Sequence, residues 1–189
     1  MRKVSSLLAF VVALLLPAFG QAPAPRLIDN DFVQKQFGNQ FTLLSGGGTA
    51  VGDLDGDGVE DLIIAARCKS PMLDQAEHNY TVMDPYDDFF GYGDPKLTTT
   101  FSAVDPSQRN LVVLIIYGSG KDGWRAETPK AKFVIVNLPY RAISIRKLKL
   151  RKRTVEAVFI EEASDTGDNS ALVFDGKKFR YVPMGGDMQ

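Results

Sequence analysis

The sequence predicts a mainly β fold, an antiparallel sheet or sandwich-like domain with one short N-terminal helix. Apolar and β-branched runs recur from Asn110 onward with turn residues between them, which is the pattern of consecutive hairpin strands. An acidic, glycine-rich loop at 53–61 lies between two further apolar segments, which predicts a strand-loop-strand hairpin. From Asn110 onward, the sequence has no long stretch with the periodicity of an amphipathic helix.

The first 20 residues are typical of a secretory signal peptide. Two basic residues precede the apolar run 7–16, which ends at Pro17 and is followed by small residues. A membrane-spanning helix needs about 20 apolar residues, and this run is shorter. We therefore expect cleavage after Gly20, a linker at 21–26, no membrane span, and a periplasmic or secreted protein.

Residues 27–189 are expected to form a single β-rich domain. The stretch DNDFVQKQFG at 29–38 begins with capping residues, has apolar residues at helical spacing and ends in glycine, so it predicts a short helix. The stretch 49–66 predicts the strand-loop-strand hairpin. Residues 67–108 contain four prolines and are expected to be a long irregular excursion, of the kind that is functional or merely decorates the fold.

The second half of the chain is expected to be an antiparallel sheet, folded over on itself or on the first hairpin. The turn GSGKDGW at 118–124 follows its first strand. The predicted strands are LVVLIIY (111–117), KFVIVNL (132–138), AISIRKLKL (142–150), TVEAVFIEE (154–162), SALVF (170–174) and KFRYV (178–182).

The loop at 53–61 predicts a calcium site. Asp53, Asp55, Asp57 and Asp61 occupy its first, third, fifth and ninth places, and so many carboxylates repel one another unless a cation lies among them or their pKa values rise. Oxygen ligands without His or Cys favour Ca²⁺ over zinc or copper, and Mg²⁺ prefers a stricter octahedron with retained waters. Val59, in seventh place, is expected to offer its backbone carbonyl.

An EF-hand opens in the same way but needs a bidentate Glu in the twelfth place and a helix on each side. Here that place is Ile64, within an apolar strand. The stretch AVGDLDGDGVEDLIIAA at 50–66 resembles instead the FG-GAP or VCBS type of repeat, whose D-x-D-x-D-G-x-x-D loop joins two antiparallel strands. That resemblance implies Ca²⁺ binding by Asp53, Asp55, Asp57 and Asp61.

Several copies of that repeat build a β-propeller, whereas this chain has a single copy. We therefore expect no complete propeller, because each blade needs neighbours that bury its faces. With ALVFDGKKFRYV near its end, the chain also resembles exported bacterial proteins of unknown function that carry one such loop.

Charge and cysteine content narrow the classes of partner. Without Arg2 and Lys3 the chain has 20 basic and 23 acidic residues, a formal charge of −3, which gives no reason to expect nucleic acid as a partner. The single cysteine, Cys68, cannot form a disulfide within the chain. It is either a buried apolar thiol or half of an intermolecular bridge.

Two further segments have both a functional and a structural interpretation. RKLKLRKR at 146–153 either binds an anionic polymer or is the solvated face of a hairpin whose charges discourage aggregation. The stretch 77–95 mixes carboxylates with Tyr80, Tyr86, Phe89, Phe90 and Tyr92. It is either an aromatic binding surface or a loop that buries its rings.

Signs of catalysis are few. The only histidine is His78, and H-E-x-x-H and G-x-S-x-G are both absent. GSGK at 118–121 lacks the first glycine and the Ser or Thr of a P-loop, so we interpret it as a β-turn. A glycosidase needs two carboxylates, for which Glu161, Glu162, Asp165 and Asp168 are candidates.

The sequence thus predicts an exported, calcium-binding β module that is not an enzyme and that has an unidentified protein or polysaccharide partner. Two alternatives stay open. One is a hydrolase of extracellular polymer with structural Ca²⁺. The other is an envelope protein that docks on anionic polymer through the hairpin at 146–153.

Overall fold

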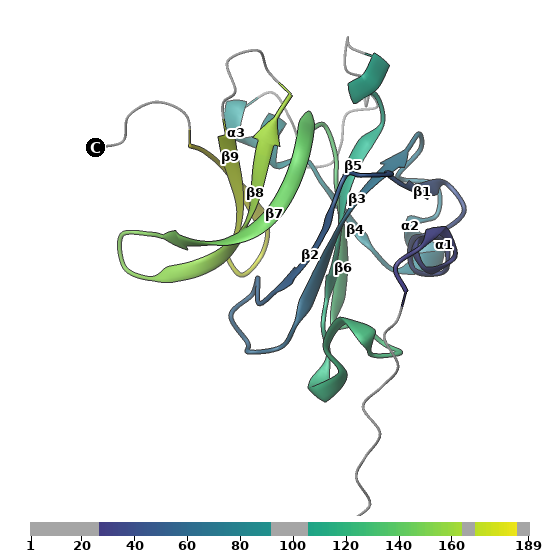
Figure 1. Ribbon diagram of the computed structural model, residues 1–189, viewed down its shortest axis with the longest axis horizontal. Coiled ribbons are helices and arrows are strands. Elements are labelled where there is room, and N and C mark those ends of the chain that lie inside the picture. Colours follow the sequence, from purple (N-terminus) through teal and green to yellow (C-terminus); the bar gives the residue numbers. More distant parts are fainter. Residues whose placement is uncertain (1–26, 92–105, 164–168, 185–189) are drawn as a thin grey trace, which may run out of the picture.

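The computed structural model describes residues 27–91, 106–163 and 169–184. The predicted signal peptide and the linker at 21–26 lie outside these ranges. Two β-sheets pack against each other, and helix α1 covers the outer face of the first sheet (Figure 1). In the described part of the chain, no helix has the length and apolar character needed to cross a membrane.

The first sheet, called sheet A, contains the predicted strand-loop-strand hairpin. Its strands are β1 (Phe41–Leu43), β2 (Thr49–Gly52), β3 (Asp61–Cys68), β4 (Thr81–Met83), β5 (Leu111–Tyr117) and β6 (Ala131–Ile135). The order is β1-β3-β5-β6-β4, and β2 also pairs with β3. All pairs are antiparallel except β4 with β6.

The second sheet, called sheet B, is an antiparallel meander of the last four strands. They are β7 (Tyr140–Lys149), β8 (Thr154–Glu162), β9 (Asn169–Phe174) and β10 (Phe179–Pro183), and each pairs with the next along the chain. In Figure 1 β7 passes beside β2, and the tip of the β7–β8 hairpin extends away from sheet A. The prediction of a mainly β, sandwich-like fold is confirmed.

Strands β3 and β5 are buried on both faces, which explains their uninterrupted apolar sequences. Ile63 and Ile115 face sheet B, whereas Leu62 and Ile116 face the helix side. Helix α1 (Asn30–Phe37) closes the helix side with Phe32, Val33 and Phe37. The Asp29 carboxylate caps α1 by accepting from the Phe32 N–H at 2.8 Å, so the predicted helix is also confirmed.

One hydroxyl joins the two sheets inside the core. Tyr140 begins β7 in sheet B, and its hydroxyl donates to the backbone carbonyl of Val112 in sheet A at 2.8 Å. Tyr140 is 1% exposed, so the hydrogen bond satisfies a phenol that burial would otherwise leave unpaired.

The excursion at 67–108 is more regular than we predicted. It contains α2 (Gln75–His78), β4, α3 (Pro85–Phe90) and the 3₁₀ turn η1 (Pro106–Gln108), while residues 92–105 lie outside the described ranges. Strand β4 escapes prediction because its three residues are too few to show a period, and pairing with β6 alone makes it a strand.

Two further expectations need correction. The predicted turn at 118–124 is a 3₁₀ segment, η2 (Gly120–Arg125), with Trp124 buried under the helix side of sheet A. The second half of the chain is also not one sheet, because β5 and β6 complete sheet A and only the four later strands form sheet B.

Candidate metal centre

The loop between β2 and β3 curls around the carboxylate of Asp53. Oδ1 of Asp53 accepts from the N–H groups of Gly56 at 2.8 Å and Asp57 at 3.0 Å, and Oδ2 accepts from Gly58 at 2.9 Å. Gly56 and Gly58 have φ values of 79° and 82°, a left-handed backbone that glycine adopts without strain. The alternating glycines therefore allow the loop to close on its first aspartate.

Asp61 is the buried anchor of the loop. It begins β3 with 1% of its surface exposed, and both carboxylate oxygens accept backbone N–H groups, from Leu54 at 2.8 Å and from Gly118 at 2.9 Å. Burial raises the pKa of the Asp61 carboxyl to about 6, with a smaller contribution from the charges of Asp55 and Asp57.

Three of the predicted ligands lie together. Asp53, Asp55 and Asp61 each place one carboxylate oxygen within 4.8 Å of the others, so this group could hold a metal ion. A carboxylate has about four lone-pair sites. The two hydrogen bonds on Asp61 and the three on Asp53 therefore leave acceptor capacity for a cation, and the donor set is made only of oxygen.

The other two predicted ligands lie beside this group. Asp57 is outside the group of three, and its Oδ1 accepts from the N–H of Val59 at 2.9 Å. Ligation by the Val59 carbonyl stays a prediction.

Lys130 is a member of the site that sequence analysis missed. Its Nζ lies 2.6 Å from Oδ2 of Asp55 and 2.6 Å from Oδ2 of Asp57. The Lys130 ammonium lowers the pKa of Asp57, and the two carboxylates raise the pKa of Lys130. Lys130 precedes β6 and is 73 residues from Asp57, so no local pattern in the sequence points to the pairing.

Tyr117 lies next to the site, because the residue that follows it, Gly118, donates its N–H to Asp61. It is 2% exposed, and its hydroxyl has no hydrogen-bond partner among the described residues. Burial raises the pKa of Tyr117, and the charges of all four loop aspartates raise it further, which places the phenol in their electrostatic field. The ring packs edge-on against Phe174, with centroids 5.3 Å apart.

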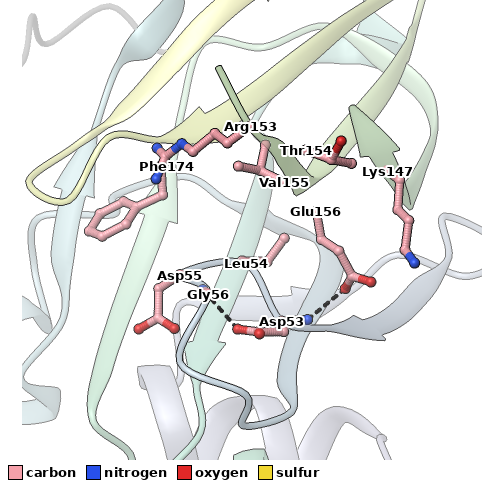
Figure 2. Close-up of a pocket in the computed structure, with 10 residues that line it drawn as sticks. All are labelled: Asp53, Leu54, Asp55, Gly56, Lys147, Arg153, Thr154, Val155, Glu156 and Phe174. Carbon is pink, nitrogen blue, oxygen red and sulfur yellow. Dashed lines mark hydrogen bonds between the residues drawn. The ribbon is translucent and has the colours of Figure 1, made fainter. Parts of the chain in front are cut away.

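A cleft of about 460 Å³ separates the loop from the β7–β8 hairpin. Asp53, Asp55 and Leu54 line one side, and Lys147, Arg153 and Glu156 line the other. In Figure 2 the side chain of Glu156 extends from the hairpin toward Asp53, whereas Lys147 and Arg153 lie at opposite ends of the cleft, with Arg153 extending toward Phe174. Oε2 of Glu156 accepts from the Asp53 N–H at 2.7 Å across this cleft (Figure 2).

The basic segment 146–153 is a hairpin, which agrees with both of its interpretations. It covers the end of β7, the turn and the residue before β8. Leu148 is buried in a small cluster with Ala157, Ala171 and Val173, whereas Lys147 and Lys149 are exposed. Of its cations, Lys147 and Arg153 line the cleft.

The aromatic segment 77–95 fits each of its two interpretations in part, because one ring is buried and two others are half exposed. Tyr80 is buried against Phe37 and Phe41, and its hydroxyl donates to the Pro71 carbonyl. Phe89 and Phe90 are about half exposed beside Tyr181. Tyr92 lies outside the described residues.

The remaining candidates are the thiol of Cys68 and the four carboxylates considered for a glycosidase. Cys68 is buried, and burial raises its pKa to about 11, as expected for an apolar thiol. Glu162 accepts from the Tyr181 hydroxyl at 2.5 Å, and Glu161 is exposed on β8. Asp165 and Asp168 lie outside the described ranges.

Comparison with protein-family models, curated proteins and solved structures found no match to this chain. The resemblance to FG-GAP and VCBS repeats therefore rests on the loop motif alone.

Proposed function

We propose that this protein is an exported calcium-binding β module with a binding or structural role, and that it is not an enzyme. The observation that carries the proposal is the convergence of Asp53, Asp55 and Asp61 within 4.8 Å. Their donors are all hard oxygens, which suit Ca²⁺ and Mg²⁺ and disfavour zinc and copper.

Calcium is preferred over magnesium for a physical reason. Mg²⁺ requires near-ideal octahedral geometry and usually keeps several waters, whereas Ca²⁺ accepts six to eight oxygens in flexible arrangements. Asp53 and Asp61 are already fixed by backbone hydrogen bonds, so the ligand positions follow the loop backbone and are not free to adjust to a small ion. Asp57 and the carbonyl of Val59 are the expected additional ligands.

A bound ion would stiffen the junction between the two sheets. The N–H of Gly118, the residue after β5, donates to Asp61, and the N–H of Asp53 donates to Glu156 of β8. A cation shared by Asp53, Asp55 and Asp61 would tie both connections to one centre. The resulting rigid surface would serve an unidentified protein or polysaccharide partner outside the cytoplasm.

The test is calcium-dependent stability. At free Ca²⁺ equal to 100 times its dissociation constant, one site present only in the folded state contributes about 2.7 kcal/mol, which raises the melting temperature by several degrees. Thermal unfolding in EDTA is compared with unfolding in Ca²⁺ or Mg²⁺, and calorimetry measures binding directly. Extracellular modules often bind Ca²⁺ at about 0.1 to 1 mM, so the titration extends to tens of millimolar.

A matched pair of variants separates site binding from general charge effects. Asp55→Asn with Asp57→Asn should abolish most of the calcium effect, and Asp31→Asn with Asp122→Asn, two exposed aspartates, should leave it intact. If Ca²⁺ and EDTA give the same melting temperature and calorimetry detects no binding, the proposal is wrong.

The cleft does not support the alternative that the protein is a hydrolase. A hydrolase would be favoured by paired carboxylates in a cleft distant from the aspartate loop, whereas the 460 Å³ cleft borders the loop itself. Its carboxylate from sheet B, Glu156, already accepts the Asp53 N–H.

A further inference from the structure

We infer that the tip of the β7–β8 hairpin, residues 146–153, is a docking surface for an extended anionic polysaccharide with carboxylate or sulfate groups along its chain. The inference goes beyond the proposed function and does not depend on the calcium site. It concerns the basic segment, which a calcium-binding module leaves without a role.

Positive charge is concentrated in this one segment of the chain. No Asp or Glu occurs between Glu127 and Glu156, and outside the tip the chain has 16 basic and 23 acidic residues, a formal charge of −7. A strongly basic element on an otherwise acidic protein attracts an anion to that one place. The six cations of the tip are Arg146, Lys147, Lys149, Arg151, Lys152 and Arg153.

The tip is an ordered hairpin. The N–H of Leu150 donates to the carbonyl of Arg153 at 2.8 Å and closes the turn. Leu148 is 8% exposed and packs in a small apolar cluster with Ala157 and Val173. This cluster fixes the backbone that carries the cations, so binding a ligand costs less conformational entropy than it would in a flexible loop.

The cations of the tip are presented to solvent, because the tip extends away from sheet A (Figure 1). Lys147 and Lys149 are exposed, and side chains two residues apart on one face of a strand lie about 7 Å from each other. Arg151, Lys152 and Arg153 are exposed in the turn. Among the described residues, none of the ion pairs involves a residue of the tip.

The carboxylate opposite Lys147 does not neutralise it. Glu156 is the partner of Lys147 in the β7–β8 register, but its Oε2 accepts the Asp53 N–H at 2.7 Å. Arg146 differs from the other cations, because its guanidinium lies over the Phe159 ring, 5.4 Å from the centroid. The other five cations of the tip therefore remain for a ligand.

The arrangement of these cations suits a polymer better than a small anion. Lys147 and Arg153 lie at opposite ends of the cleft beside the tip (Figure 2), so their charged groups do not converge on one point. A small anion requires converging donors. A polymer with charges at intervals can contact separated cations in succession, and the linked contacts add to its overall affinity.

Shape and charge favour a polysaccharide over a membrane or a nucleic-acid duplex. The apolar residues of the tip are Leu148, which is buried, and Leu150, which is partly buried, so the tip has no exposed apolar side chain to insert into a bilayer. A duplex or a bilayer also brings phosphates close to the acidic remainder of the protein. A single polysaccharide chain can follow the hairpin alone, and it is a polymer of the space to which the predicted signal peptide would direct the protein.

The experiment is calorimetric titration of the purified protein, in EDTA, with heparin, polygalacturonate and uncharged dextran. We expect both anionic polymers to bind and dextran not to bind. Raising NaCl from 0.1 to 1 M should weaken binding by about tenfold or more, because the Debye length shortens from about 10 Å to about 3 Å. EDTA removes Ca²⁺, so the result does not depend on the proposed calcium site.

Variants of the tip test the named residues. Lys149→Gln with Arg151→Gln and Lys152→Gln removes three positive charges and should weaken heparin binding by about tenfold or more, because the local positive potential falls. Lys149→Arg with Arg151→Lys and Lys152→Arg keeps the charge and should bind within about threefold of the parent protein.

A matched control removes the same charge elsewhere. Lys69→Gln with Lys121→Gln and Lys177→Gln changes three exposed residues outside the tip and should alter heparin affinity by less than about threefold. Thermal unfolding checks that every variant folds, which is expected because all the substituted side chains are exposed.

Three results would overturn the inference. The first is no binding of either anionic polymer in low-salt buffer, or equal losses in the tip variant and the control variant. The second is tighter binding to a DNA duplex or to vesicles of anionic phospholipid, which would assign the tip to another class of partner. The third is self-association that the tip variant loses, without polysaccharide binding, which would show that the tip docks on the acidic surface of a second copy.

Discussion

The backbone N–H of Asp53 donates a 2.7 Å hydrogen bond to Oε2 of Glu156, a residue 103 positions later in the other sheet. The approach is close because Gly52 precedes the loop: a Cβ atom there would lie 2.4 Å from the same Oε2 atom. The first aspartate of the loop is therefore positioned by sheet B as well as by its own turn.

This connection gives the first prediction. Glu156→Ala leaves the Asp53 N–H without its charged acceptor and should lower the free energy of unfolding by about 2 kcal/mol. It should also weaken Ca²⁺ binding, because Asp53 is no longer held. Urea unfolding and calorimetry measure the two effects. Glu161→Ala, at an exposed position of the same strand, is the control, and equal losses in both variants would contradict the assigned role of Glu156.

Asp61 should have a structural role that Asp55 lacks. In Asp61→Asn the amide nitrogen cannot accept a hydrogen bond, so the N–H of Leu54 or Gly118 loses its buried acceptor. We expect the metal-free protein to lose about 2 kcal/mol of unfolding free energy. Asp55→Asn should cost less than about 1 kcal/mol in EDTA while also reducing calcium affinity. Urea unfolding in EDTA measures the loss in each variant. Equal losses of unfolding free energy would contradict a structural role for Asp61 that Asp55 lacks.

Lys130 should compete with the metal ion. Its ammonium lies on Oδ2 of both Asp55 and Asp57, so Lys130→Met removes a positive charge next to the cation. We expect calcium affinity to rise about fivefold, equivalent to about 1 kcal/mol for a partly exposed ion pair. The control is Lys121→Met, at an exposed residue without an ion pair in the described structure. A fall in calcium affinity on loss of Lys130 would show that Lys130 assists the site.

The turn between β9 and β10 is expected to contribute to the stability of the fold in a pH-dependent way. Asp175 accepts from the N–H groups of Lys178 and Lys177 and from Arg180, and these donors lower its pKa from 3.8 to about 2. Because the folded pKa lies below the unfolded one, the stabilisation is complete above about pH 4 and disappears as the pH falls through about 2.

The variant Asp175→Asn measures this contribution. It should be less stable than the parent protein by about 1 kcal/mol at pH 7, and the difference should shrink steadily between pH 4 and pH 2 in urea-unfolding experiments. Asp122→Asn, at an exposed residue, should show no such trend. A difference that stays constant down to pH 2 would contradict the prediction.

Local sequence determined the elements that carry their own signals. The α1 helix has its cap, its apolar spacing and its terminal glycine within ten residues, and the loop aspartates are two residues apart, so both follow from short-range rules. The hairpin strands were predictable because β-branched runs alternate with turn residues. Such signals identify an element and its type. They do not say which strands share a sheet.

Tertiary structure decided what depends on distant parts of the chain. Strand β4 exists because it pairs with β6, Lys130 reaches Asp57 across 73 residues, and Glu156 reaches Asp53 across 103. The cleft likewise exists only because the β7–β8 hairpin lies opposite the loop. The sequence by itself therefore determined the strand-loop-strand unit and the spacing of its aspartates, since these depend on neighbouring residues. The packing of the two sheets determined which cations and which cleft accompany those aspartates, because a contact between distant segments leaves no periodic trace in either one.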